Sequence, residues 1–157
     1  MIVSQCIPFV LRESITLNVL QSRIHGLDHW FRVWKNAELL NGLESGADME
    51  VVALFALFHD SMRMNDGDDP KHGLHGYKLW ERFHRMHGIV IGMSSRREEL
   101  LFEACTEHNN GHTTDDPTIG VCWDADRLDI HRTGIWPDVR YMSTQVGVSL
   151  IMTRINP

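Results

Sequence analysis

An adjacent pair, His59-Asp60, stands at the end of the most apolar segment of the chain, VVALFALF at 51–58. Burying a carboxylate there costs several kcal/mol unless it is paired, hydrogen-bonded or bound to a metal. In a chain with ten histidines, chance alone is expected to give about one such pair, so the dipeptide by itself proves nothing. Asp60 either faces solvent at the helix end or belongs to a ligand set, and further members of such a set decide between the two.

Two more histidines point inward by helical phase. His72 falls on the apolar stripe of its helix with Leu79 and Phe83, and His108 is in line with Cys105. A lone histidine on an apolar stripe is more often a core residue than a ligand. Several inward histidines on different helices favour a shared site.

A third histidine and a distant carboxylate complete the candidate set. His29 lies at the rim of an apolar stripe near the start of its helix. Asp124 and Asp126 are about 200° apart on one helix, so only one of them can face a given site. Asp126 shares a face with Cys122 and Asp129, which favours Asp126 as the ligand.

The elements that position these residues are helical. Apolar periodicity predicts helices over 11–24, 28–40, 49–60, 72–87, 96–109 and 119–132. Gly42 and Gly88 are expected stops, Asp48 is the expected N-cap of the central helix, and 64–71 and 112–118 are expected loops. Residues 139–151 fit a helix or two short strands. These patterns predict an all-α, single-domain helical bundle over 1–157, with about six or seven helices.

Composition narrows the class of protein. A net charge of −6 argues against a nucleic-acid-binding surface. No apolar run approaches the roughly 20 residues that cross a bilayer, and the N-terminus makes a poor signal peptide, so we expect a cytoplasmic protein away from the membrane. Three widely spaced cysteines are expected to be buried free thiols.

The ordered set His29, His59-Asp60 and Asp126 resembles the HD domain family of metal-dependent phosphohydrolases. The flanking stretches HWFRV, LFHD and ADRLD match the family's surroundings, and the resemblance covers about 25–132. It implies that these four residues hold a divalent ion such as Mn, Fe, Co, Ni, Zn or Mg. It further implies hydrolysis of a small phosphate ester or nucleotide by a metal-activated water. The ion would also supply the positive charge that an acidic chain lacks.

The resemblance extends to a second ion. Many family members bind it through two further histidines, and His72 and His108 occupy those places here. With a single ion, the same two residues become the candidate catalytic acid or base. Some small nucleotidase members carry an acidic residue where this chain has Arg63, so that catalytic role cannot be carried over. Arg63 and His112 are instead candidate substrate-binding residues.

Three alternatives stay open at this stage. Some relatives of the family use six ligands to hold a di-iron centre that oxidises a substrate with oxygen. A binding or sensory module could keep the metal for structure alone. The simplest alternative is a helical bundle without a metal site, in which the number of histidines is high by chance.

Overall fold

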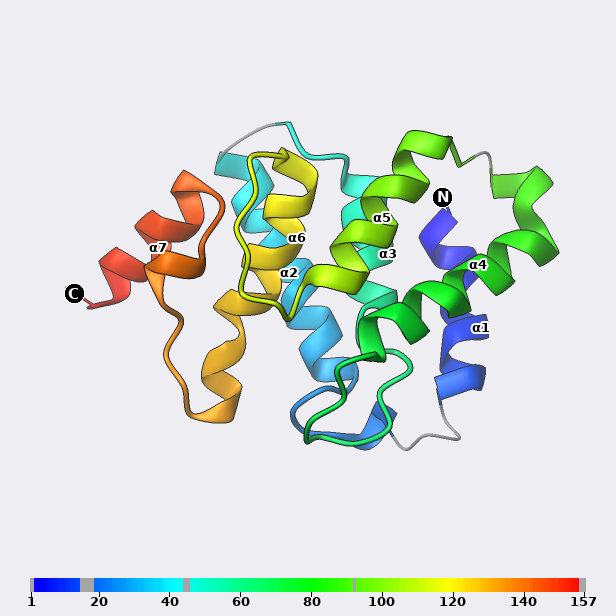
Figure 1. The fold of residues 1–157 in the computed structure, drawn as a ribbon, viewed down its shortest axis with the longest axis horizontal. Helices are drawn as coiled ribbons and strands as arrows, with labels where there is room; N and C mark the ends of the chain where they lie inside the picture. The colour runs from blue at the N-terminus through cyan, green and yellow to red at the C-terminus, as the bar shows by residue number, and fades with distance from the viewer. Residues whose placement is uncertain (1, 15–18, 44–45, 92, 156–157) are drawn as a thin grey trace.

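The computed structural model describes residues 2–14, 19–43, 46–91 and 93–155 (Figure 1). These residues form α-helices and short 3₁₀ helices, and no strand occurs among them, which confirms the all-helical prediction. The α-helices are α1 (Ile2–Ser14), α2 (Leu27–Leu43), α3 (Met49–Phe58), α4 (His72–Ile91), α5 (Ser95–Glu107), α6 (Pro117–Leu128) and α7 (Gln145–Ile155). The 3₁₀ helices are η2 (Val19–Gln21), η3 (Ile130–Thr133) and η4 (Val139–Tyr141).

Helix α3 is the centre of the bundle. It packs against α1, α2, α4, α5 and α6, as expected of a helix that is apolar on every side. The Asp48 side chain accepts the backbone N–H of Glu50 at 3.1 Å, so the predicted N-cap is confirmed. The helix ends at Phe58 with His59 as its C-cap, which places Asp60 just beyond the last turn.

Two glycines let α4 approach the ends of α3 and α5. A Cβ atom at Gly76 would overlap the carbonyl oxygen of Phe58, and one at Gly73 would overlap the carbonyl oxygen of Cys105. Only glycine permits this close backbone contact. The contact brings the first residue of α4, His72, next to the C-terminal ends of α3 and α5.

Helix α6 lies along α2. Asp116 caps it by accepting the N–H groups of Thr118 and Ile119, and Pro117 occupies its first turn. Asn36 Nδ2 donates to the carbonyl oxygen of Ala125 at 2.9 Å across the α2–α6 interface.

The helix predicted over 11–24 is wrong in position. Helix α1 runs from Ile2 to Ser14 and buries Cys6 and Val10. Residues 15–18 lie outside the described residues, and a short 3₁₀ helix follows them at 19–21. The Ser22 hydroxyl accepts the N–H groups of Ile24 and His25, which is turn geometry. Burial of the earlier apolar stripe outweighs local propensity here.

Other boundaries shift by a few residues. Helix α2 continues through Gly42 and α4 through Gly88, so neither glycine is the predicted stop. A helix can absorb a single glycine at about 1 kcal/mol when its neighbours are held by packing. The loop at 64–71 is confirmed. Within 139–151, the short 3₁₀ helix η4 and the start of α7 are separated by the non-helical residues 142–144, and no strand forms there.

Two further expectations concern the whole chain. Within the described residues, no helix has the length and apolar character needed to cross a bilayer. Cys6, Cys105 and Cys122 are buried thiols, as predicted. Burial raises the pKa of the Cys6 thiol to about 12.

Candidate metal centre

Six predicted ligands converge at one end of the bundle. The N-terminal end of α2 lies between the loop that follows α3 and the segment that follows α6 (Figure 1). One group of potential ligands is His29, His59 and Asp126, and a second is Asp60, His72 and His108. In each group, one ligand atom per residue lies within 4.8 Å of the others. The residues come from five helix ends or turns, and all except Asp126 are buried.

Asp60 joins the two groups. Its Oδ2 lies 3.4 Å from His29 Nε2 and 3.6 Å from His59 Nε2. Its Oδ1 lies 3.3 Å from His72 Nε2. A second carboxylate, that of Asp126, also contacts His29: its Oδ1 lies 3.2 Å from His29 Nε2. One carboxylate therefore has one oxygen directed at each group, as a bridging ligand would.

Three of the histidines have a fixed tautomer. The Nδ1 atom of His29 donates to Asp129 Oδ2 at 2.8 Å, that of His59 to the Phe55 carbonyl at 3.0 Å, and that of His108 to the Cys105 carbonyl at 2.7 Å. These oxygens only accept, so each neutral ring keeps its proton on Nδ1 and presents a bare Nε2. A protein that binds metal through imidazole orients it in this way.

The Nε2 atoms of two of these rings face each other. His29 Nε2 and His59 Nε2 are 3.2 Å apart, with the oxygens of Asp60 and Asp126 beside them. Lone pairs and carboxylates at this distance repel unless a positive charge lies among them. Two nitrogens bound to one ion at about 2.1 Å and at right angles are about 3 Å apart, so the spacing fits metal ligation.

His72 differs from the other three. Its Nδ1 contacts the carbonyl oxygen of Asp69, and Arg63 Nη1 lies 2.8 Å from the same nitrogen. One neighbour accepts and the other donates, so the fold permits either tautomer. Its Nε2, 2.8 Å from His108 Nε2, can present a lone pair or carry a proton.

The electrostatics of the centre favour the ligand forms of these groups. Burial opposes the charged forms of Asp60 and Asp126, but the neighbouring histidines outweigh it and hold the pKa of both carboxyls below its usual value. Burial lowers the pKa of His59 and of His72 to about 4. The carboxylates are therefore ionised and these two imidazoles neutral near pH 7, which metal binding requires.

His29 shows how strongly the centre attracts positive charge. Burial opposes its protonation, yet hydrogen bonds with Asp126, Asp129 and Asp60 raise its pKa to about 10. Without a metal, a proton on Nε2 then lies between two carboxylates. A divalent ion would replace that proton with more charge.

Asp129 supports the centre and was not predicted to do so. It follows Asp126 by three residues and accepts hydrogen bonds from His29 Nδ1 and from Arg32 Nε, the latter at 2.7 Å. A carboxylate behind a ligating histidine fixes the ring and raises its basicity. Its shared face with Asp126 was the sequence signal for this role.

Asp124 faces the opposite way, as the helical phase predicts. Its carboxylate accepts the backbone N–H groups of Ser143 and Thr144, both at 2.8 Å, and the Thr144 hydroxyl at 2.7 Å. This carboxylate anchors the segment that starts α7 and has no part in the centre.

Two arginines flank the centre. Arg63 Nη1 is 3.8 Å from Asp60 Oδ1, and Arg63 Nη2 donates to the Gly67 carbonyl at 3.0 Å. Arg132 Nη2 lies 3.9 Å from Asp126 Oδ1, and Arg132 Nε donates to the Ile24 carbonyl at 2.6 Å. Arg132 escaped sequence analysis because only the turn of η3 brings it back toward Asp126.

A cavity of about 680 Å³ opens over the centre. Its lining includes the floor residues Asp60, His72, His108 and Asp126, together with Arg63 and Arg132. His25 also lines it, with Nδ1 2.9 Å from Asp66 Oδ1. His112, a candidate substrate-binding residue from the sequence, is exposed and is not part of the lining. The turn at Gly111, with φ of 71°, directs the chain away before His112.

Comparison with models of known protein families gives no significant match, and comparisons with characterised proteins and with solved structures give none either.

Proposed function

We propose that the chain is a metal-dependent phosphohydrolase that acts on a small phosphate ester. The observation that carries the proposal is the pair His29 and His59, whose Nε2 atoms face each other at 3.2 Å beside Asp60 and Asp126. Their Nδ1 atoms are committed to acceptors, so the inward nitrogens are left for a cation.

His29, His59, Asp60 and Asp126 would hold a first divalent ion, and His72 and His108 with the other oxygen of Asp60 would hold a second. A bound ion of this kind lowers the pKa of a coordinated water and neutralises charge on a phosphoryl group. The remaining steps fall to residues of the chain.

Arg63 and Arg132 approach the centre from two sides and line the cavity above it. Guanidinium groups in such places bind phosphoryl oxygens and hold the phosphorus over the floor. If one ion binds, His72 Nε2 is free to take or give a proton, because both of its tautomers have partners.

Metal analysis tests the proposal first. Purified protein should contain one or two equivalents of divalent metal and should hydrolyse p-nitrophenyl phosphate when Mn, Co, Ni or Mg is supplied. His59→Ala should abolish both properties. His84→Ala is the matched control, because His84 pairs with Glu98 away from the centre and should change neither. Protein that binds no metal and gains no phosphatase activity would overturn the proposal.

The division into two groups of three favours one second candidate, a di-iron oxygenase. Asp60 directs one oxygen at each group, which suits a pair of ions bridged by a carboxylate. Protein prepared without air and loaded with two irons should then consume oxygen in the presence of substrate. Phosphatase activity that survives the removal of iron would exclude this candidate.

A further inference from the structure

One wall of the cavity is apolar. It is formed by the segment between η3 and η4 with its neighbours, and its apolar members are Ile130, Ile135, Trp136, Pro137 and Met142. Asp138, at the end of the segment, also lines the cavity and pairs with Arg140. Trp136 is 73% exposed and Ile135 is 58% exposed, although both line the cavity. Among the described residues, no aromatic ring or cation stacks on Trp136. Removing a large exposed indole from water is favourable, and a molecule bound in the cavity against Trp136 would gain this free energy.

The chain holds this wall at both ends. Gly134, with φ of 84°, ends η3 and turns the backbone into the segment. At the other end Asp138 caps η4 by accepting the N–H of Arg140 at 2.9 Å. Arg127 donates to the carbonyl oxygens of Tyr141 and His108, which ties the far end of the wall to the floor. Trp136 is therefore presented on a fixed segment.

Two carboxylates from the loop before α4, Asp68 and Asp69, also line the cavity. They follow Gly67, whose carbonyl accepts from Arg63. A second phosphate placed beside these carboxylates would meet like charge, which is unfavourable, so they favour a substrate with a single phosphate.

The volume points to the same kind of substrate. About 680 Å³ lies in the range of cavities that hold ligands of drug size. A phosphoryl group on the floor occupies only a small part of it, and the rest is bounded by Trp136 and Ile135 on one side. We infer that Trp136 and Ile135 bind the leaving group of the substrate, and that this group is flat, apolar and uncharged, such as an aryl group. The inference rests on the proposed phosphohydrolase function, because the floor must hold the phosphoryl end.

Two phosphonates that cannot be hydrolysed test the inference without an activity assay. Protein loaded with Mn²⁺ is titrated by calorimetry with phenylphosphonate and with methylphosphonate. We expect phenylphosphonate to bind about tenfold more tightly, and Trp136→Ala to remove about this factor while leaving methylphosphonate unchanged. Trp136→Phe should keep most of the preference, because a phenyl ring still stacks.

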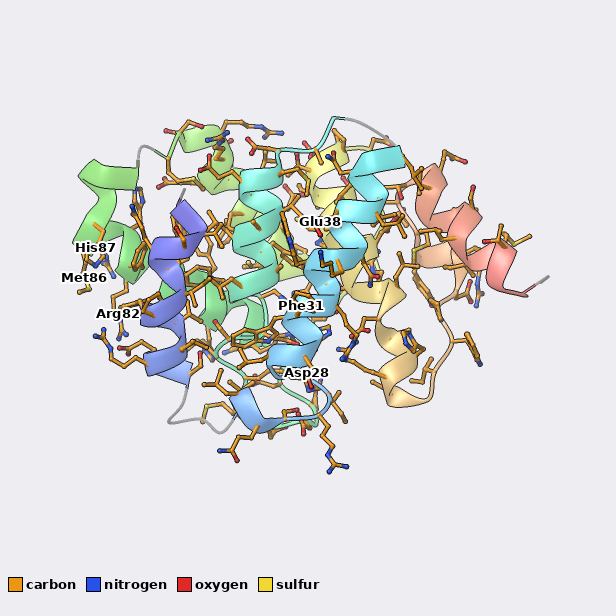
Figure 2. All side chains as sticks on the ribbon, turned by 180° about the vertical axis from the view of Figure 1, so that it is seen from behind. Asp28, Phe31, Glu38, Arg82, Met86 and His87 are labelled. Atoms are coloured by element: carbon orange, nitrogen blue, oxygen red, sulfur yellow. The ribbon has the colours of Figure 1, made fainter. Side chains whose placement is uncertain are left out.

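Phe31→Ala is the matched control. Phe31 is 61% exposed on the outward side of α2 and lines a separate apolar groove between α1 and α2 (Figure 2). Removing this exposed aromatic should change neither affinity.

The outcomes separate the two proposals. If methylphosphonate binds in a metal-dependent way but phenylphosphonate is not preferred, the inference about Trp136 fails and the proposed function stands. The inference also fails if Trp136→Ala weakens both ligands equally, because that result shows a structural role. If neither phosphonate binds and no metal is held, the proposed function fails and this inference fails with it.

Discussion

Two carboxylates of α6, two residues apart, lie in opposite environments. Asp124 accepts three hydrogen bonds from the segment that starts α7. Asp126 lies 3.2 Å from His29 Nε2 and 3.9 Å from Arg132 Nη2. Donors of the fold satisfy the first carboxylate, whereas the second pairs with His29, which Asp60 also contacts.

The pKa shifts express the same contrast. Burial raises the pKa of Asp124, whereas at Asp126 burial is outweighed by His29 and the pKa falls below its usual value. Asp124 thus belongs to the fold, whereas Asp126 is the proposed metal ligand. Burial alone does not identify a functional carboxylate; the supply of hydrogen-bond donors around it does.

The largest effect should come from Asp126→Asn. Loss of a direct ligand should lower metal affinity and phosphatase activity by at least about a thousandfold, because even residues behind the ligands usually cost 10- to 100-fold. The free energy of unfolding of the metal-free protein should fall by about 1.5 kcal/mol near pH 7, because the protonated His29 loses one of its carboxylate partners. Metal analysis, activity and urea unfolding measure the three quantities. A variant with full metal content would show that Asp126 is no ligand.

Asp124→Ala should reverse this pattern. It leaves the N–H groups of Ser143 and Thr144 and the Thr144 hydroxyl without their buried acceptor, which should lower the free energy of unfolding by about 3 kcal/mol. Metal content and activity per folded molecule should stay at the wild-type level. Urea unfolding beside metal analysis of the folded fraction checks both, and loss of metal with intact stability would contradict the assignment.

Local pattern predicted much of this arrangement. The N-cap Asp48, the loop at 64–71 and the inward phase of His72 and His108 depend only on residues near in sequence. The same holds for the choice of Asp126 over Asp124. The assignment of these residues to a catalytic centre stays a prediction.

The parts that escaped prediction depend on distant contacts. Arg132 reaches the centre through a 3₁₀ turn, and Asp129 matters because His29, 100 residues earlier, lies beside it. His112 was predicted to bind substrate from its place beside a ligand helix, but a single turn at Gly111 sends it to the surface. Helical periodicity places Asp129 on the face of Asp126, but it does not identify these distant partners or the turns that lead to them.

A pair of glycines extends the comparison from side chains to the backbone. Gly76→Ala would push a methyl group into the Phe58 carbonyl, moving α4 and His72 with it. We expect a loss of about 2 kcal/mol in the free energy of unfolding, as for other overpacked contacts, together with weaker metal binding at the His72 group. Gly42→Ala is the matched control, because nothing lies within 4 Å of an added Cβ atom and the helix should gain about 0.5–1 kcal/mol. Thermal or urea unfolding measures the free energy of unfolding of both variants. Equal changes in the two would refute the argument that Gly76 is required for the close contact.

The smallest effect should come from Asp129→Asn, which tests whether a residue behind the ligands belongs to the site or to the fold. The amide can still accept from His29 Nδ1, but the charge that makes the ring a stronger ligand is lost. Metal affinity should fall by about tenfold, at the lower end of the range for such residues. Adding the metal in excess should therefore restore the activity of the variant. Competition with a chelator measures the affinity. A change in the free energy of unfolding without a change in metal affinity would show that Asp129, like Asp124, serves only the fold, by holding α6 against α2.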